Sequence, residues 1–333
     1  MTQVSVVIPY FQRERGILKR ALQSIIEQDL PADVLIKVVV VDDESPSPIE
    51  PETEGLTFPP SISLITVKQK NGGVGAARDT GLKNIGDETD YVAFLDSDDY
   101  WKKLHIATAL QVLEQGYDFY FTDHSRDEHH ASHFDYIGFP PPTAKSHLQE
   151  IGRHLFEVDK DYLFSYFLRK FTAQISTVIY RRLINPDAKF ESALKSSGED
   201  FLFLLQLILC SKKLCFSTKP WATCGKGINI YYSTFGWNDE GHLRRHMADI
   251  LAAYYLISAL QLAGSNKQHI QSVIKNARQR FAFFSIRWFI KGTRPWSQEL
   301  KGLTRRDPGF WLWYPLTSIS VTVLYLLKLY KPT

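Results

Sequence analysis

Two short runs of β-branched residues near the N-terminus limit the fold more than any other feature of the chain. Val4–Ile8 and Lys37–Val41 are almost continuously apolar, as in strands that are buried on both faces of a parallel sheet. Between them, apolar residues recur at helical spacing over residues 17–26. Three further elements are expected in the order strand, helix, strand, at Ile62–Val67, Gly75–Leu82 and Tyr91–Leu95. This alternation predicts a doubly wound, mostly parallel α/β sheet with helices on both faces.

Charge is distributed unevenly along the 333 residues. Residues 241–333 contain 14 Lys and Arg against 3 Asp and Glu, whereas the first 240 residues contain 25 against 33. We therefore expect an α/β body in two halves, residues 1–125 and 126–240, followed by a basic helical region over 241–333. Such a basic region favours an anionic membrane surface as partner. The odd number of cysteines, three, favours a reduced cytoplasmic setting over a disulfide framework.

Three carboxylates follow the strand expected at 91–95. Asp96, Asp98 and Asp99 fall within four consecutive positions and would repel one another unless a cation neutralised them. A hard divalent ion, Mn²⁺ or Mg²⁺, fits carboxylates that share it with a diphosphate. The alternative is a solvated acidic turn before the next helix.

Two other segments are expected at the same edge of the sheet, because ligands bind beyond the carboxyl ends of parallel strands. Asp42 ends the second strand and could accept hydrogen bonds from a base or from ribose hydroxyls, or could simply be a turn residue. Asn71–Gly81 is a glycine-rich loop that runs into a helix, although it fits neither the P-loop nor the dinucleotide fingerprint. Arg78 in this loop could bind a diphosphate through its planar guanidinium, or could lie on the surface.

In this order, the segments resemble the family 2 glycosyltransferases of the GT-A fold. The matching segments are Ser5–Phe11, Val40–Ser45, Asn71–Arg78 and Leu95–Asp99. The resemblance is strongest over residues 3–125 and looser up to about residue 235. The sequence departs from the family pattern at Gln12, where Asn is usual, and at Glu44, where Gly is common.

The resemblance implies a sugar-nucleotide donor and a divalent metal, Mn²⁺ or Mg²⁺. Carried over by position, the donor-binding residues are Pro9, Phe11, Asp42, Arg78 and Asp96, and the metal-binding residues are Asp98 and, in an assisting role, Asp99. Phe11 would stack on the base, Asp42 would contact the same base, and Arg78 would bind the diphosphate.

Ser197–Asp200 resembles the Glu-Asp motif of the same family. Asp200 begins a long apolar helix, so it could be only a carboxylate that the helix dipole favours. The resemblance instead implies that Asp200 is the catalytic base, which takes the proton from the acceptor hydroxyl. That hydroxyl would attack the anomeric carbon opposite the leaving nucleotide and invert its configuration, while the metal and Arg78 stabilise the diphosphate.

Residues 8–22 and 42–49 also look like bacterial exopolysaccharide glucosyltransferases of the succinoglycan type. This implies UDP-glucose as donor, a polyprenyl-diphosphate-linked oligosaccharide as acceptor, a peripheral position at the cytoplasmic face of the inner membrane, and no nucleic acid partner. Phe284 stands where a processive synthase would carry Gln before Arg287-Trp288, so we expect single additions. Two alternatives stay open: a catalytically degenerate transferase that serves as a scaffold or sensor, and a sugar nucleotidyltransferase.

The uncharged segment Trp311–Leu327 is the clearest membrane candidate. Its length is at the lower limit for a span, and Pro315 weakens that interpretation. Aromatic residues at one end and Lys328 at the other suit a membrane interface. We expect an interfacial or re-entrant anchor, with a packed core helix or a true span as alternatives.

Residues 122–150 are polar and rich in His, Asp and Pro, so we expect a loop that leads into the second half of the body. The spacing of its histidines is irregular, which favours a solvated loop over a metal site; they are His124, His129, His130 and His133. Trp237 and His242, further along the chain, are expected to be mainly structural.

Overall fold

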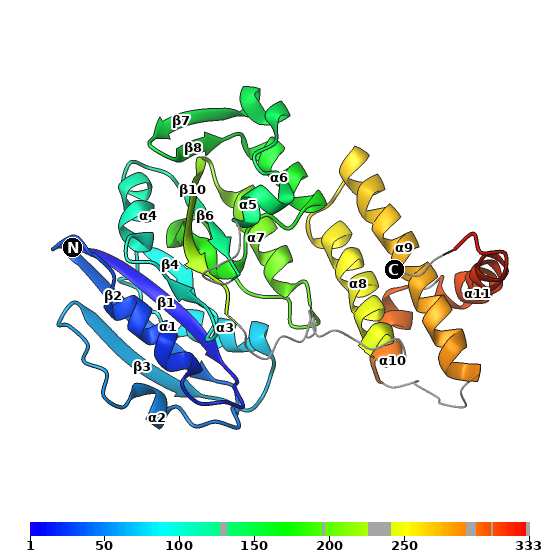
Figure 1. Ribbon diagram of the computed structural model, residues 1–333, viewed down its shortest axis with the longest axis horizontal. Coiled ribbons are helices and arrows are strands. Elements are labelled where there is room, and N and C mark those ends of the chain that lie inside the picture. Colours follow the sequence, from blue (N-terminus) through cyan, green and yellow to red (C-terminus); the bar gives the residue numbers. More distant parts are fainter. Residues whose placement is uncertain (127–131, 195–196, 226–240, 291–297, 308, 331–333) are drawn as a thin grey trace. The chain divides into compact units, whose positions relative to one another are not determined.

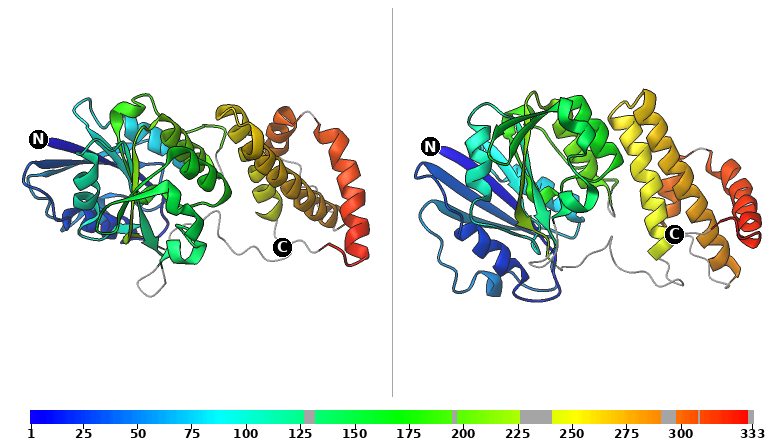
Figure 2. Two further views of the ribbon diagram at one scale, coloured as in Figure 1. Left: turned by 90° about the horizontal axis from the view of Figure 1, so that it is seen from above. Right: turned by 45° about the horizontal axis from the view of Figure 1, so that its top comes forward.

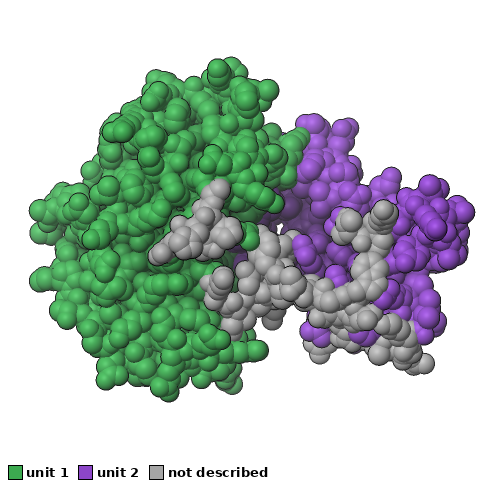
Figure 3. Space-filling view, viewed as in Figure 1, with its two compact units in different colours: residues 1–195, 203–229 green, residues 196–202, 230–333 purple. Residues whose placement is uncertain are grey.

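The computed structural model describes residues 1–126, 132–194, 197–225, 241–290, 298–307 and 309–330. The chain divides into two compact units, which Figure 3 colours separately. Unit 1 comprises residues 1–195 and 203–229, and unit 2 comprises residues 196–202 and 230–333. The division of the body into halves at residue 125 stays a prediction.

Unit 1 is built around a mixed sheet of ten strands (Figure 1). The strand order is β3-β2-β1-β4-β9-β6-β10-β8-β7, and β5 pairs with β10. The strands are β1 (Thr2–Tyr10), β2 (Val34–Asp42), β3 (Ile62–Lys68), β4 (Tyr91–Phe94), β5 (Tyr100–Trp101), β6 (Phe119–Ser125), β7 (Leu148–Gly152), β8 (Leu155–Val158), β9 (Val178–Arg181) and β10 (Leu214–Thr223). The α-helices are α1 (Ile17–Ile26), α2 (Glu50–Thr53), α3 (Val74–Lys83), α4 (His105–Leu113), α5 (His133–Ile137), α6 (Lys160–Arg169) and α7 (Glu199–Cys210), the last beginning in unit 2.

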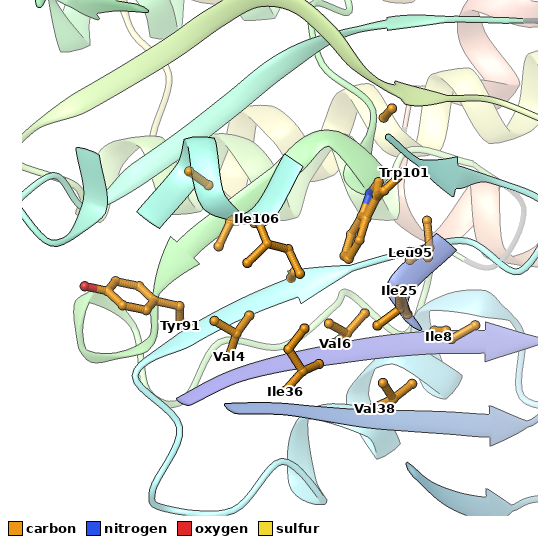
Figure 4. Close-up of a cluster of buried hydrophobic side chains, with 14 of the residues drawn as sticks. Val4, Val6, Ile8, Ile25, Ile36, Val38, Tyr91, Leu95, Trp101 and Ile106 are labelled. Atoms are coloured by element: carbon orange, nitrogen blue, oxygen red, sulfur yellow. The ribbon is translucent and has the colours of Figure 1, made fainter. Parts of the chain in front are cut away.

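The strands expected from the sequence form the parallel part of this sheet. β1 pairs in parallel with β2 and with β4, and β2 pairs in parallel with β3. On one face, Val4, Val6 and Ile8 of β1 belong to a buried cluster with Ile25 of α1 and Ile106 of α4 (Figure 4). Burying each of these side chains contributes about 1.5–3 kcal/mol.

The opposite face of β1 is covered by α3. Gly81 of α3 lies so close to the strand that a Cβ at this position would overlap the Val7 side chain, so the glycine permits direct contact between helix and sheet. Helices therefore cover both faces of the parallel strands, which confirms the predicted doubly wound α/β fold.

The second part of the sheet depends on a strand that the sequence did not reveal. β9 lies antiparallel between β4 and β6, and thereby joins segments that are far apart in the chain. Phe94 of β4 and Tyr180 of β9 stack at 6.4 Å between ring centroids, and Phe203 of α7 contacts Phe94 edge-on at 5.5 Å. This aromatic packing anchors the unit 1 part of α7 to the sheet.

The polar stretch 122–150 is not the loop that we expected. Residues 122–125 complete β6, which pairs with β10 up to Ser125. A short helix α5, a 3₁₀ helix (Pro142–His147) and strand β7 account for most of the other described residues. The polar composition concealed this strand, in which Asp123 Oδ1 accepts hydrogen bonds from the backbone N–H groups of His124 and Phe134.

Unit 2 contains four helices among its described residues, namely α8 (Gly241–Ala259), α9 (Gly264–Ile290), α10 (Gln298–Arg306) and α11 (Phe310–Leu326). α9 packs against α8 and against α11 (Figure 2). The buried carboxylate of Asp307 accepts hydrogen bonds from Arg278 and from the Trp313 indole, each at 2.7 Å. The predicted helical C-terminal region is thus confirmed.

Two expectations about unit 2 are answered by the structure. None of the described helices is both long and apolar enough to cross a bilayer. His242 stacks on Phe284 with ring centroids 4.3 Å apart, in agreement with a structural role. Trp237 lies outside the described residues.

The core of unit 1 contains a buried histidine, His105, whose protonation makes the stability of the fold depend on pH. The His105 ring is fully buried and lies 4.6 Å from the Trp101 ring and 6.3 Å from the Tyr120 ring, measured between centroids. Neither of its ring nitrogens has a hydrogen-bond partner among the residues that the structure describes. Burial therefore lowers the pKa of His105 from 6.5 to about 3.

The free energy of unfolding should fall as the pH drops from 6.5 towards 3, because His105 takes up a proton in the unfolded chain but not in the folded one. This single group contributes about 1.4 kcal/mol per pH unit over that window. His105→Phe keeps a ring against Trp101 and should reduce the slope by that amount. Urea unfolding at several pH values checks this, and equal slopes for the two proteins would contradict it.

Candidate active site

The carboxyl ends of β1, β2 and β4 bring the predicted donor residues to one edge of the sheet. Tyr10 lies opposite Asp42 in the register of β1 and β2, and the partly buried Phe11 follows directly. The backbone N–H of Leu95 donates to the carbonyl of Val7, after which the chain leaves β4 and Asp96 begins the acidic turn. Pro9 lies one position further inside β1 and is buried.

The two aspartates at the end of β2 accept hydrogen bonds from different loops. Asp42 Oδ1 accepts a hydrogen bond from the backbone N–H of Ser45 at 2.8 Å and so holds the following turn. Asp43 accepts from the backbone N–H groups of Gly72 and Gly73, at 2.8 and 3.0 Å, and from the Gln69 amide at 2.7 Å. The carboxylate of Asp43 therefore attaches the glycine-rich loop to the sheet, a role that the sequence did not indicate.

Arg78 and Asp96, which were predicted to hold different parts of a donor, contact each other. Arg78 Nη2 lies 2.8 Å from Asp96 Oδ1, and the guanidinium lies 5.4 Å from the centroid of the Phe190 ring. The Arg78 side chain is only 3% exposed, whereas that of Asp96 is 33% exposed. The pair therefore places a buried cation, Arg78, beside a partly exposed carboxylate at the edge where the glycine-rich loop and the acidic turn meet.

The acidic turn is held from several sides. The carbonyl of Asp98 accepts a hydrogen bond from Arg20 of α1 at 2.8 Å, and the Arg20 guanidinium lies 4.7 Å from the Tyr100 ring centroid. Asp99 Oδ1 accepts from the backbone N–H of Gly225 at 3.0 Å. A Cβ at Gly225 would overlap the Asp98 carbonyl, so the chain after β10 can approach the turn this closely only because the residue is glycine.

Ser176 accepts two hydrogen bonds that hold the same turn. Its hydroxyl accepts a hydrogen bond from the backbone N–H of Asp96 at 3.0 Å, and its carbonyl accepts from the Trp101 indole at 2.7 Å. Asp96 and Trp101, on either side of the acidic turn, are thereby tied to one residue of the short 3₁₀ helix Ile175–Thr177, which precedes β9. The backbone of the turn that carries these carboxylates is therefore held in place by contacts within the protein.

The three carboxylates create a strongly negative environment. Asp99 is 5% exposed, and burial raises the pKa of its carboxyl well above the usual range. The neighbouring carboxylates of Asp98 and Asp96 raise that pKa further, and hydrogen bonds from Ser176 and Gly225 oppose the increase. A divalent cation beside Asp98 would relieve this repulsion.

The donor atoms fit a metal that is shared with a substrate better than a metal held by the protein alone. Among the described residues, no group of three or more His, Cys, Asp or Glu side chains is arranged to hold a metal ion. Mg²⁺ in proteins commonly takes one or two carboxylates and completes its shell with water and substrate phosphates. Asp98 and its neighbours match that pattern.

Gln12 connects the strands to the acidic turn. Its amide Nε2 donates to the Ser97 hydroxyl at 3.0 Å, and its backbone N–H donates to the Ser45 hydroxyl at 2.9 Å. The departure from the usual Asn at this position supplies a longer side chain that reaches between the two loops. In the sequence, the position of Gln12 directly after Phe11 was the feature that could have indicated this connecting role.

Asp200 lies in the first turn of α7, as the sequence predicted. This turn belongs to unit 2, whereas the predicted donor and metal residues belong to unit 1. The rest of α7 belongs to unit 1, where Phe203 stacks on Phe190 at 4.1 Å between ring centroids. The role of Asp200 as catalytic base stays a prediction.

The expectation of a solvated histidine loop is wrong for His124. Its side chain is buried at the end of β6 and stacks on His133, with ring centroids 4.3 Å apart. Burial lowers the pKa of His124 to about 3, and the charge of a protonated His133 lowers it further. His129 and His130 lie outside the described residues.

Two comparisons by sequence connect this geometry with known proteins. Residues 5–156 match the family model described as glycosyl transferase family 2. The succinoglycan biosynthesis protein ExoW of Rhizobium meliloti (strain 1021) is 34% identical over 320 residues, which cover 94% of each chain. The minor teichoic acid biosynthesis protein GgaA of Bacillus subtilis (strain 168) is 27% identical over 63% of this chain and 44% of its own.

Solved structures support the fold. The crystal structure of S. aureus TarS in complex with UDP-GlcNAc has a TM-score of 0.58 and 20% identity, covering 99% of this chain and 93% of that one. The mannosyltransferase PcManGT from Pyrobaculum calidifontis, in complex with GDP-Man and Mn²⁺, has a TM-score of 0.52 and 16% identity, covering 97% and 86%. The architecture is therefore the GT-A fold expected from the motifs.

Gly225→Ala should displace the acidic turn, because the new methyl group would overlap the Asp98 carbonyl. A displacement of about 1 Å at a positioning group can cost on the order of 100-fold in turnover. We expect a loss of this size in nucleotide release from a sugar nucleotide, with the circular dichroism spectrum unchanged. Gly152→Ala, where a Cβ would meet only ordinary contacts, is the matched control and should keep full activity.

Asp43→Asn should loosen the glycine-rich loop, because the amide cannot accept all three of the hydrogen bonds that the carboxylate accepts. Losing one charge-assisted hydrogen bond costs about 1.5–3 kcal/mol, so we expect the KM for the donor to rise by roughly tenfold or more. Asp187→Asn changes an exposed aspartate and provides the control. An unchanged KM for Asp43→Asn would contradict this role.

Proposed function

The chain belongs to glycosyltransferase family 2, and we propose that it transfers a single sugar, with inversion, from a nucleoside diphosphate to a lipid-linked oligosaccharide. The observation that carries this proposal is the common edge of β1, β2 and β4. There the base-contacting candidate Asp42 and the metal-binding candidate Asp98 follow buried strands, and the cation Arg78 of helix α3 pairs with Asp96. A nucleotide, a diphosphate and a metal need these chemical groups in this arrangement.

The donor is held by residues on both sides of the edge. Phe11 stacks on the base and Asp42 accepts its hydrogen bonds, with Pro9 lining the pocket behind them. Arg78 exchanges part of its contact with Asp96 for the donor diphosphate, leaving Asp96 to bind the nucleoside side. UDP-glucose is the favoured donor, on the resemblance to the succinoglycan type, and the similarity to ExoW supports the place in exopolysaccharide synthesis.

Asp98 holds a divalent cation, Mn²⁺ or Mg²⁺, and Asp99 assists. When bound, the cation would neutralise the negative charge that develops on the departing diphosphate. The bonds from Arg20 and Gly225 keep the turn in place, so the carboxylates need no rearrangement when the donor arrives. Asp99, whose Oδ1 already accepts from Gly225, contributes mainly by fixing the direction of Asp98.

Asp200 acts as the base. It accepts the proton from the acceptor hydroxyl as this oxygen attacks the anomeric carbon, on the side opposite the leaving nucleoside diphosphate. The new bond forms as the bond to the diphosphate oxygen breaks, which inverts the configuration. Arg78 remains beside the leaving group and stabilises its charge.

The acceptor is a polyprenyl-diphosphate-linked oligosaccharide, so the enzyme works at the cytoplasmic face of a membrane as a peripheral protein. The basic balance of residues 241–333 supports this location, because cationic segments are attracted to anionic lipids. The sugar is added once per encounter, in keeping with the absence of Gln before Arg287-Trp288 in the sequence.

Nucleotide release from a panel of sugar nucleotides, with Mn²⁺ or Mg²⁺, tests the proposal. Asp98→Ala should lose metal-dependent donor binding together with turnover. Asp200→Asn should keep donor binding but lower kcat by about 100-fold or more, the contribution of a general base. The exposed Asp187→Asn should behave as the native protein.

Different failures point to different errors. Full activity of Asp200→Asn would remove this residue from the base role and leave the donor site intact. Donor binding without turnover, even with a lipid-linked acceptor present, would favour a scaffold that binds sugar nucleotides. Formation of a sugar nucleotide from a sugar phosphate would identify a nucleotidyltransferase instead.

A further inference from the structure

Helix α11 presents an apolar face to solvent. Its exposed large side chains include Leu312, Leu316, Ile319, Val323 and Leu326, whose spacing of four and three residues places them on one side of the helix. We call these five residues the α11 apolar face. Leu316 is 63% exposed and Ile319 is 65% exposed, so the face is not covered by the rest of unit 2.

The other side of α11 is already used for packing. Phe310 and Val321 are fully buried, and the Phe310 ring stacks on Tyr314 and lies 6.0 Å from the Phe281 ring of α9. The views in Figure 2 show α11 at the edge of unit 2, with α9 on its inner side. The helix is therefore fixed in orientation, and its apolar face cannot turn inward.

The apolar face is wider than a single row of side chains. Trp311 and Leu327 beside it are also exposed, as are Phe289 and Ile290 at the end of α9. Single exposed apolar residues are common on protein surfaces, but a row of them along one face of a helix is typical of an interaction site.

Spacing of four and three residues would also suit a coiled coil with a second helix. In coiled coils, however, the positions that flank the seam usually carry charges, which select the partner and its direction. Here the flanking positions are Trp313, Ser320 and Leu327 on one side and Pro315 and Thr322 on the other. The absence of charge in the sequence 310–327 favours a lipid phase over a second helix.

Exposed cationic side chains precede and follow the α11 apolar face in the sequence. Lys301, Arg305 and Arg306 of α10 are exposed just before α11, and Lys328 is exposed directly after it. Asp307, the acid next to Arg306 in the sequence, does not offset them because it is buried and paired with Arg278. An uncharged helix between exposed cations complements a bilayer surface, in which apolar chains lie beneath anionic headgroups.

We propose that the α11 apolar face enters one leaflet of an anionic membrane, with the helix lying along the surface and Lys301, Arg305 and Lys328 at the headgroups. The inference extends the proposed membrane location to a defined element, but it does not depend on the donor or the reaction. The helix is about 25 Å long, and interfacial helices of this type sink about 5–10 Å into the bilayer. The membrane contact is therefore made by unit 2.

Vesicle co-sedimentation with the full chain tests this inference. The native protein should bind vesicles that contain phosphatidylglycerol. The double variant Leu316→Asp/Ile319→Asp should bind them at least about tenfold more weakly, since two apolar side chains no longer enter the lipid. Leu183→Asp replaces a leucine of unit 1 that is 79% exposed, and this matched control should bind as the native protein does.

Charge is tested separately. Lys301→Glu/Arg305→Glu should lose most of the preference for phosphatidylglycerol over phosphatidylcholine, and raised salt should weaken native binding in the same direction. Unfolding temperatures of all variants should match the native value, because every substituted side chain is exposed.

Two results would overturn the inference. One is unchanged vesicle binding by Leu316→Asp/Ile319→Asp. The other is a native oligomer that this variant converts to monomer while vesicle binding persists, since the face would then join two copies of the chain.

Hydrolysis of the sugar nucleotide by the double variant should equal that of the native protein. An inactive native protein that still shows the expected vesicle binding would refute the proposed reaction and not this inference.

Discussion

Parallel pairing of β1 with β2 and β4 is the constraint on which the rest of the molecule depends. Because parallel strands end at the same edge, the turns that follow them are brought together regardless of their distance in the sequence. Helices on both faces then bury the valines and isoleucines, which leaves this edge as the place where polar groups of several loops can meet. The direction of the strands therefore determines where the candidate site lies, and the side chains determine its chemistry.

The loops at that edge would be mobile without a second set of contacts. Asp43 holds the glycine-rich loop, Gln12 connects the turns after β1 and β4, and Ser176 and Gly225 support the acidic turn. They hold these loops in a fixed frame: Asp43 and Ser176 accept hydrogen bonds from backbone N–H groups, Gln12 donates to the Ser97 hydroxyl, and the backbone N–H of Gly225 donates to the Asp99 carboxylate.

Elements with a local signal could be predicted, and elements defined by a distant partner could not. Val4–Ile8 and Lys37–Val41 were recognised because β-branched runs need burial on both faces, and the observed strands extend each run by a few residues. β9 was not predicted although Val178–Tyr180 is β-branched and aromatic, because the strand has only four residues and its place between β4 and β6 is set by distant segments. In the candidate site, the motifs predicted roles for Asp42, Arg78 and Asp96, which stay predictions. The ion pair between the last two and the hydrogen bond between Asp99 and Gly225, across 126 residues, could not be predicted from a local pattern.

The position of Gly225 has a consequence for how the site comes into being. The acidic turn is synthesised early, yet its supports at Ser176 and Gly225 emerge from the ribosome much later, and β5 has no partner until β10 exists. A nascent chain that ends before Ser176 therefore contains the acidic turn without the residues that hold its backbone in the complete protein.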